Sequence, residues 1–141
     1  MEQSISVEIA APSERVWDVL SDVESWLAWT PTVTSVERLE EGPLQVGSRA
    51  RVSQPRIPTT EYAVTELEPG RSFTWVATGP GVHTTARHDL EPLADGGTRV
   101  RLSVAQEGWL GSLMGRFYRG LTDRYLANEA QGLKARCEGA G

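Results

Sequence analysis

Hydrophobic and polar positions alternate with a period of two along most of this chain. Near the N-terminus, Ile5, Val7 and Ile9 alternate with polar residues, a pattern typical of a half-buried strand. Six further segments, separated by turn-forming residues such as glycine and proline, favour the same conformation. These segments are residues 33–39, 46–54, 60–67, 72–78, 82–90 and 98–107. Short strands joined by turns predict a curved antiparallel sheet of about seven strands.

Two short helices are predicted between the first strand and the second. Ser13 is a suitable N-cap for the first helix, which carries an apolar stripe that includes Val16 and Leu20. The second helix spans residues 23–28 and is expected to end before Pro31, because residues that precede a proline avoid the helical region. The predicted order is therefore one strand, two short helices and then the remaining strands.

A single long amphipathic helix is predicted to close the chain, from Ser112 to Cys137. At 100° per residue, one broad face collects most of its apolar side chains, while charged residues such as Arg119 and Lys134 fall opposite. The apolar face carries Leu110, Leu113, Met114, Phe117, Leu121, Tyr125, Asn128 and Gly132. We expect this face to pack on the sheet, which makes the chain an α+β protein.

The segment 60–67 does not alternate cleanly. Tyr62 and Val64 lie on one face of a regular strand, whereas Ala63 and Leu67 lie on the other. A β-bulge inserts one extra residue and would bring both apolar sets to the same face.

Alternation also sorts the histidines. In the segment 82–90, Thr84, Ala86 and His88 share the apolar face, and His83 lies on the opposite face. Two histidines on opposite faces of one strand cannot hold one metal ion, and no cysteine pair accompanies them. The sequence therefore predicts no metal site and leaves His88 as the one histidine directed inward.

Composition bounds the class of protein. The 141 residues contain 39% hydrophobic and 23% charged residues, which predicts one globular domain over residues 1–141. The net charge of −5 argues against a nucleic-acid partner, which requires a basic face. No apolar run approaches the roughly 20 residues of a membrane span, and Cys137 has no cysteine to pair with. We expect a cytoplasmic monomer or homodimer without an integral membrane segment.

Several motifs along nearly the whole chain resemble the START-like helix-grip superfamily, also called SRPBCC, and most closely its polyketide cyclase/dehydrase-like branch. The motifs are IAAPSERVWDVL at residues 9–20, DVESWLAWTP at 22–31, VGSR at 46–49, VTELEPGR at 64–71 and GGTRV at 96–100. The resemblance implies a sheet that wraps around the C-terminal helix and encloses a hydrophobic cavity. These motifs mark turns and core positions, so they are typical of a fold rather than of one activity.

The candidate site combines side chains from the inner face of the sheet, the short helices and the long helix. An apolar and aromatic lining with a few polar groups is typical of small-molecule sites. The expected lining is Trp26, Trp29, Tyr62, Phe73, Trp75, Thr84, His88, Phe117, Leu121, Tyr125 and Asn128. Trp26 is also interpreted as a core plug.

Three classes of function fit this lining. The first is noncovalent binding of a hydrophobic or aromatic small molecule, lipid-like or polyketide-like. The second is a cofactor-free aromatic cyclase or dehydratase, in which His88 moves a proton and Tyr125 donates a hydrogen bond to a developing enolate. The third is a protein-interaction module, which would present a broad exposed apolar patch in place of a cavity.

Overall fold

A curved antiparallel sheet dominates the computed structural model, which describes residues 2–55, 57–117 and 119–139. Its strands are β1 (Glu2–Ile9), β2 (Ser35–Arg38), β3 (Arg49–Gln54), β4 (Ile57–Glu68), β5 (Ser72–Gly79), β6 (Val82–Pro92) and β7 (Thr98–Glu107). In the described residues, they form one seven-stranded sheet in the order β1-β7-β6-β5-β4-β3-β2. Every neighbouring pair is antiparallel. The predicted sheet is confirmed, with β1 joining the far edge beside β7.

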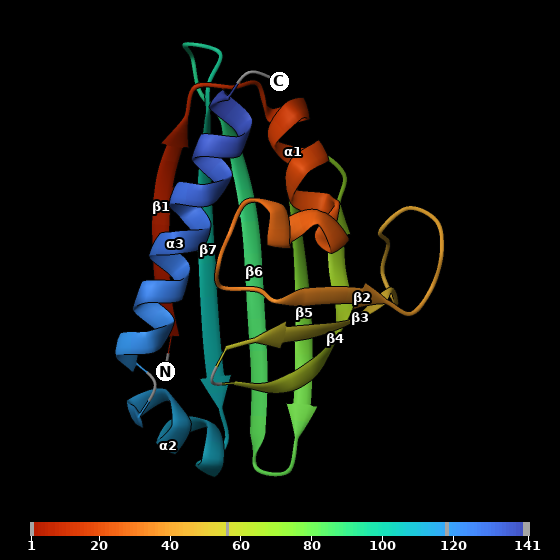
Figure 1. Cartoon of the computed structure of the whole chain (residues 1–141), viewed down its shortest axis with the longest axis vertical. Helices are drawn as coiled ribbons and strands as arrows, with labels where there is room; N and C mark the ends of the chain where they lie inside the picture. Colours follow the sequence, from red (N-terminus) through yellow and green to blue (C-terminus); the bar gives the residue numbers. More distant parts are fainter. Residues whose placement is uncertain (1, 56, 118, 140–141) are drawn as a thin grey trace.

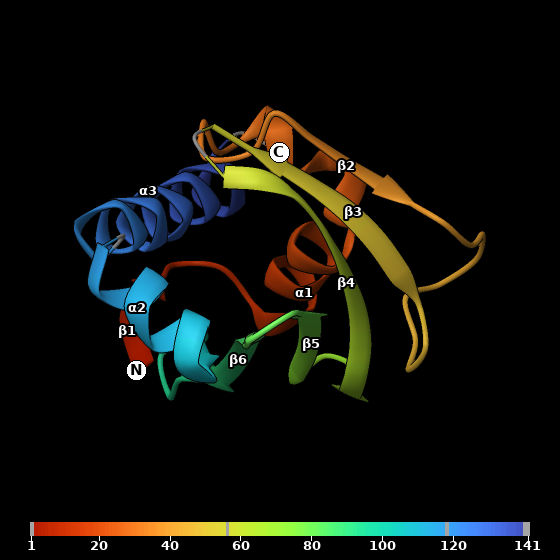
Figure 2. The ribbon, with the colours of Figure 1, turned by 90° about the horizontal axis from the view of Figure 1, so that it is seen from below.

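The helices lie within the curve of the sheet and across its open side (Figures 1 and 2). They are α1 (Ser13–Ser21), the 3-10 helix η1 (Val23–Ala28), α2 (Trp109–Phe117) and α3 (Arg119–Glu138). Figure 2 shows the sheet curling from β1 towards β2, with α3 spanning the opening. The predicted helix-grip architecture, with two short helices after the first strand, is confirmed.

The predicted bulge in β4 is present, and it explains the curvature of the sheet at this point. The pairing of β4 with β5 shifts register between Val64 and Glu66, so that Leu67 faces Phe73 after Val64 has faced Trp75. Tyr62, Val64 and Leu67 all contribute to the core or pack against it. Because a bulge bends its strand and increases the twist, it directs the first half of β4 over the cavity.

The predicted single helix from Ser112 to Cys137 is wrong in its start and in its phase. The structure has two helices, α2 and α3, with different axes (Figure 1), and residue 118 lies outside the described residues. The inner face of α3 carries Leu126, Ala130, Leu133 and Cys137, all buried. These residues fall about 160° around the axis from the face predicted for one continuous helix. The apolar phase of α2 therefore does not continue into α3.

One glycine allows α3 to approach the chain after η1. A Cβ atom built on Gly132 would lie 2.0 Å from the backbone oxygen of Trp29, far inside contact distance. The same helix contains Gly120, where a Cβ atom would meet nothing within 4 Å. α3 can therefore lie close to Trp29 because residue 132 has no side chain, whereas the packing at position 120 does not require a glycine.

A cluster of aromatic rings forms the centre of the core. Trp26 is buried and its indole N–H donates a hydrogen bond to the carbonyl of Leu20 (2.9 Å). Its ring lies 5.4 Å from that of Trp75 and 5.6 Å from that of His88, measured between centroids. Phe73 is fully buried and stacks on His88. The interpretation of Trp26 as a core residue is confirmed.

Candidate functional site

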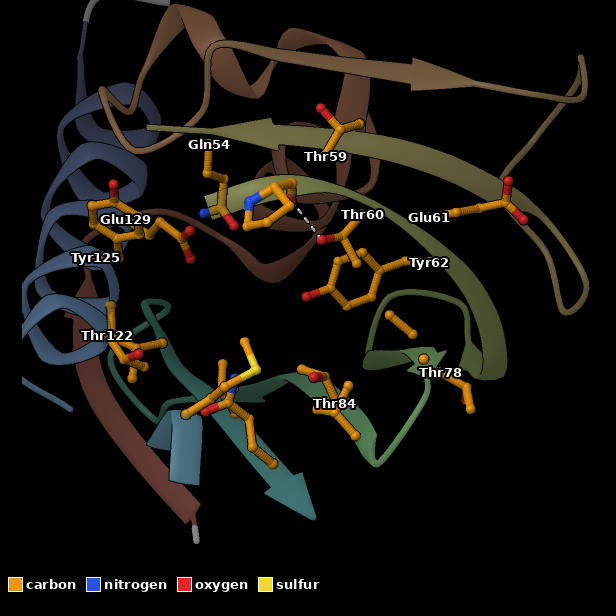
Figure 3. Close-up of a pocket in the computed structure, with 18 residues that line it drawn as sticks. Gln54, Thr59, Thr60, Glu61, Tyr62, Thr78, Thr84, Thr122, Tyr125 and Glu129 are labelled. Atoms are coloured by element: carbon orange, nitrogen blue, oxygen red, sulfur yellow. Dashed lines mark hydrogen bonds between the residues drawn. The ribbon is translucent and has the colours of Figure 1, made fainter. Parts of the chain in front are cut away.

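A cavity of about 380 Å³ lies between the sheet and helices α2 and α3 (Figure 3). Its walls are β3 to β7 on one side and α2 and α3 on the other. The lining residues are Gln54, Pro58, Thr59, Thr60, Glu61, Tyr62, Ala77, Thr78, Gly79, Val82, Thr84, Val104, Gln106, Met114, Thr122, Tyr125, Leu126 and Glu129. The wall is mixed: threonines, tyrosines and amides alternate with small apolar side chains.

A second, smaller cavity of about 70 Å³ adjoins the first and reaches the aromatic core. Trp26, Trp75 and His88 line only the smaller one. The residues that line both are Gln54, Tyr62, Val104, Leu126 and Glu129. The two spaces are therefore neighbouring chambers, a wide outer one and a small inner one, and Glu129 and Tyr62 lie at the junction because they line both.

Glu129 is the polar group that α3 contributes to this junction. The Thr32 hydroxyl donates a hydrogen bond of 3.1 Å to Glu129 Oε1, and a Thr30 hydroxyl lies 2.9 Å from that of Thr32. Burial raises the pKa of the Glu129 carboxyl to about 7, and the Thr32 hydrogen bond opposes this rise. Near neutral pH the carboxyl group at the junction is therefore present in both its protonated and its ionised form.

Tyr62 faces Glu129 from the sheet side, and Figure 3 shows the two side chains pointing toward one another across the cavity. The Tyr62 ring stacks on Trp75 with centroids 5.1 Å apart. Burial, and secondarily the charge of Glu129, raise the pKa of the Tyr62 phenol to about 12. The phenol consequently stays protonated in the physiological range and can donate a hydrogen bond into the cavity.

His88 is the inward histidine, as predicted, but it is packed tightly. Its Nδ1 donates a hydrogen bond to the carbonyl of Phe73 (3.1 Å), and its ring stacks on Phe73 with centroids 4.0 Å apart. Burial lowers the pKa of His88 to about 4, although the hydrogen bond to Phe73 opposes this. The imidazole is therefore neutral at pH 7. His83 is exposed on the other face of β6.

Tyr125 lines the outer chamber, but its hydroxyl is already engaged. That hydroxyl donates a hydrogen bond to the backbone carbonyl of Pro55. The contact connects α3 to the residue that follows β3. Tyr125 and His88 line different chambers, so the structure does not bring the predicted acid–base pair together.

Replacement of Tyr125 by phenylalanine should test this contact. We expect Tyr125→Phe to lower the free energy of unfolding by about 1 kcal/mol, the usual contribution of one hydrogen bond. Urea denaturation measures the change. Asn128→Ala, at an exposed position of the same helix, serves as the control and should shift stability by less than about 0.5 kcal/mol. Equal stability of Tyr125→Phe and wild type would contradict the contact.

The structure divides the predicted lining residues into three groups. Tyr62, Thr84 and Tyr125 line the outer chamber, and Tyr62, Trp26, Trp75 and His88 line the inner one. Phe73, Trp29 and Leu121 line neither chamber. Phe117 is 79% exposed and Asn128 is also exposed, so the expectation that they face the interior is wrong. The error at Asn128 follows from the helix phase, because this residue was placed on the inner face of one long helix and lies on the outer side of α3. Phe117 belongs to α2, where its side chain is directed to solvent.

The same phase error concealed Glu129. This residue lies three positions after Leu126 and four before Leu133, at the edge of the buried stripe of α3, and is half-buried. A carboxyl group beside an apolar stripe is the signal that would have identified it, since unpaired acidic side chains are rarely buried. Thr122 was missed for a different reason, because neither alternation nor a motif marks this position.

Other features of the described residues bear on the classes of function. Residues 2–55, 57–117 and 119–139 contain no group of three potential metal ligands among His, Cys, Asp and Glu. Across the same ranges, no helix combines the length and apolar character that crossing a membrane requires. Exposed apolar side chains include Trp109, Leu113 and Phe117, which form a narrow stripe along α2. The stripe accompanies a cavity, whereas the interaction-module hypothesis expected a broad patch without one.

Comparisons with solved structures show the fold of this chain in several proteins. An aromatase/cyclase from Streptomyces sp. R1128 is 20% identical, with a TM-score of 0.79, and the match covers 98% of this chain and 93% of that one. A START superfamily protein from Mycobacterium smegmatis is 21% identical, with a TM-score of 0.75 and 97% of each chain covered. A hypothetical protein from Helicobacter pylori is 14% identical, with a TM-score of 0.80, and 96% of this chain and 86% of that one are covered. These likenesses establish a START-like fold.

Sequence comparison gives the family. No curated protein sequence matches this chain significantly. A family model described as polyketide cyclase / dehydrase and lipid transport matches residues 2–138, which is nearly the whole chain. The resemblance inferred from the motifs is therefore confirmed, and the chain belongs to the polyketide cyclase/dehydrase and lipid transport family.

Proposed function

We propose that this protein binds a small molecule with an apolar or aromatic body noncovalently in its two-chambered cavity. The observation that carries this proposal is the outer chamber of about 380 Å³ between the sheet and α3. Ligand pockets commonly have volumes of about 300–1,000 Å³ and combine apolar walls with a few convergent polar groups. The family described for this chain includes lipid transport, which is consistent with binding of this kind.

The positions of the polar groups favour one orientation of the ligand in the cavity. Val82, Val104 and Leu126 provide apolar wall, and Tyr62 and Glu129 meet at the junction of the chambers. A ligand with a polar head at the junction and an apolar body in the wide chamber satisfies both sets of contacts. Specificity in such sites usually depends on the few polar groups, because apolar walls discriminate poorly.

Filling the outer chamber tests the proposal. Thr84 lies on the cavity face of β6, and Thr85 is its neighbour on the opposite face. We expect Thr84→Trp to weaken binding of 2-naphthalenemethanol at least about tenfold, because the indole occupies ligand space. Thr85→Trp is the matched control and should bind within about threefold of wild type. Isothermal titration calorimetry gives the dissociation constants.

Two results would contradict the proposal. One is the absence of binding of any apolar probe to wild type, and the other is unchanged binding by Thr84→Trp. Native mass spectrometry of freshly purified protein adds the identity of a co-purified ligand. A molecule released unchanged supports binding alone, whereas a dehydrated or cyclised product supports an enzyme.

The alternative proposal is a cofactor-free cyclase or dehydratase with His88 and Tyr125 as its acid and hydrogen-bond donor. It has weaker support from this geometry. The lowered pKa of His88 makes its imidazole a weak base, its Nδ1 proton is held by Phe73 and the Tyr125 hydroxyl is held by Pro55. A general base also requires a pKa near the working pH for efficient proton transfer.

A further inference from the structure

The outer chamber has an uneven distribution of charge. Its described lining contains the carboxyl groups of Glu61 and Glu129 and no lysine, arginine or histidine. Figure 3 shows the Glu61 side chain directed away from the chamber, whereas Glu129 points into it. A negatively charged ligand would therefore meet a carboxylate and, among the described residues, no compensating cation on this wall.

The groups around Glu129 leave its charge unneutralised. Tyr62 faces it from β4, and the raised pKa of the phenol keeps this side chain neutral. His88, on β6, lines the inner chamber with Glu129 and is neutral because burial lowers the pKa of its imidazole. Arg87 also borders the inner chamber but is exposed, on the alternate face of β6. Tyr125 lies one helical turn away on α3, and its hydroxyl donates a hydrogen bond to the backbone carbonyl of Pro55.

Two hydroxyl groups hold Glu129 in place. Thr30 and Thr32 are 2% and 1% exposed, and their hydroxyls form a chain that ends on Glu129 Oε1. A donor fixed on one oxygen leaves the second oxygen directed to the cavity, where no hydrogen bond from a described protein group is made to it. Such an arrangement orients a carboxylate as an acceptor for a group that arrives with the ligand.

We propose that the ligand carries a basic amine, and that its ammonium group binds the Glu129 carboxylate at the junction of the two chambers while its apolar body fills the outer chamber. This inference rests on the proposed function and specifies its ligand class. A buried carboxylate gains from an ammonium partner because the pair compensates the loss of solvation of both charges when further hydrogen bonds are present. The Tyr62 hydroxyl, directed toward Glu129, adds a hydrogen-bond acceptor beside the same position.

The matched binding of three naphthalene probes tests the ligand class. The probes are 2-naphthylmethylamine, 2-naphthalenemethanol and 2-naphthoate, which share one ring system and differ in the charge of the head group. Titration calorimetry at pH 8 keeps Glu129 ionised. We expect wild type to bind the amine at least about tenfold more tightly than the naphthoate, as charge-assisted hydrogen bonds imply.

Two variants assign the preference to Glu129. Glu129→Gln should weaken the amine at least about tenfold and the alcohol by less, because the Gln side chain keeps a neutral hydrogen-bond acceptor at this position, and circular dichroism shows that the variant is folded. Glu66→Gln removes a negative charge from an exposed position of β4 and should leave the preference for the amine unchanged. Retention of that preference by Glu129→Gln would overturn the inference.

The remaining outcomes separate the inference from the proposed function. If wild type binds the alcohol and binds the naphthoate as tightly as the amine, the ligand class is wrong and the binding function stands. If none of the three probes binds, both are overturned. If Glu129→Gln loses the alcohol and the amine alike, Glu129 shapes the cavity and does not select a cation, which also overturns the inference.

Discussion

Gly132→Ala is expected to destabilise the protein by about 1–3 kcal/mol, the usual cost of forcing an extra methyl group into packed structure. The added Cβ would lie 2.0 Å from the Trp29 backbone oxygen, so α3 or the segment after η1 must move. Alanine is otherwise the better helix former by about 1 kcal/mol, which makes a net loss of stability diagnostic. Urea denaturation monitored by circular dichroism measures the change.

Gly120→Ala provides the matched control in the same helix. No atom lies within 4 Å of a Cβ at this position, so the replacement brings helix propensity without a clash and should stabilise the protein by up to about 1 kcal/mol. Opposite signs for the two variants would establish the close contact of α3 with Trp29. Stabilisation by both would show that α3 sits farther from Trp29 than described.

The sheet could be predicted from the sequence because its signals are local. Alternation and turn residues marked each strand, and the conflict between Tyr62 and Leu67 predicted the bulge that the pairing of β4 with β5 contains. The pairing of β1 with β7 was not predicted, because it joins strands from opposite ends of the chain and leaves no local pattern. Local periodicity determines which face of a strand is apolar, but it does not determine the partner.

The C-terminal helix could be predicted in existence but not in orientation. Placing residues at 100° intervals assumes one uninterrupted helix, so a break in the helix changes the face to which every later residue belongs. Two apolar side chains of α2 that entered the predicted face, Leu113 and Phe117, are exposed, so they gave a misleading phase for α3. The stripe of Leu126, Ala130, Leu133 and Cys137 is weaker as a sequence pattern because two of its members are small.

The candidate site was predicted in outline, since Tyr62, Thr84, Trp75 and His88 do line the chambers. The chemistry of the site was not predictable from the same reasoning. Whether His88 titrates near neutral pH depends on how tightly Phe73 and Trp26 enclose it, and residue type alone does not reveal this. Burial shifts the pKa values of both His88 and Glu129, in opposite senses.

These two shifts should have opposite effects on stability as the pH changes. The pKa of Glu129 rises from 4.5 to about 7 on folding, so between these values the folded state holds a proton that the unfolded state lacks. Stability from this group therefore falls as the pH rises from about 4.5 to 7. The pKa of His88 falls from 6.5 to about 4, so the unfolded state holds the extra proton and stability rises with pH over that range. In wild type the two contributions largely cancel between about pH 4.5 and 6.5.

Single variants should separate the contributions of Glu129 and His88 to the pH dependence of stability. Relative to wild type, Glu129→Gln should gain on the order of 2–3 kcal/mol in unfolding free energy between pH 4.5 and 7, because it removes the cost of ionising a buried carboxyl. His88→Gln should lose stability overall through its lost ring stacking, but its difference from wild type should shrink by a similar amount as the pH falls from 6.5 to 4. Urea denaturation at half-unit pH intervals measures both differences, from which the other titrating groups cancel. Profiles parallel to wild type would contradict the burial of these groups, and the expected opposite slopes would show that burial favours the neutral form of an acid and of a base that line the same chamber.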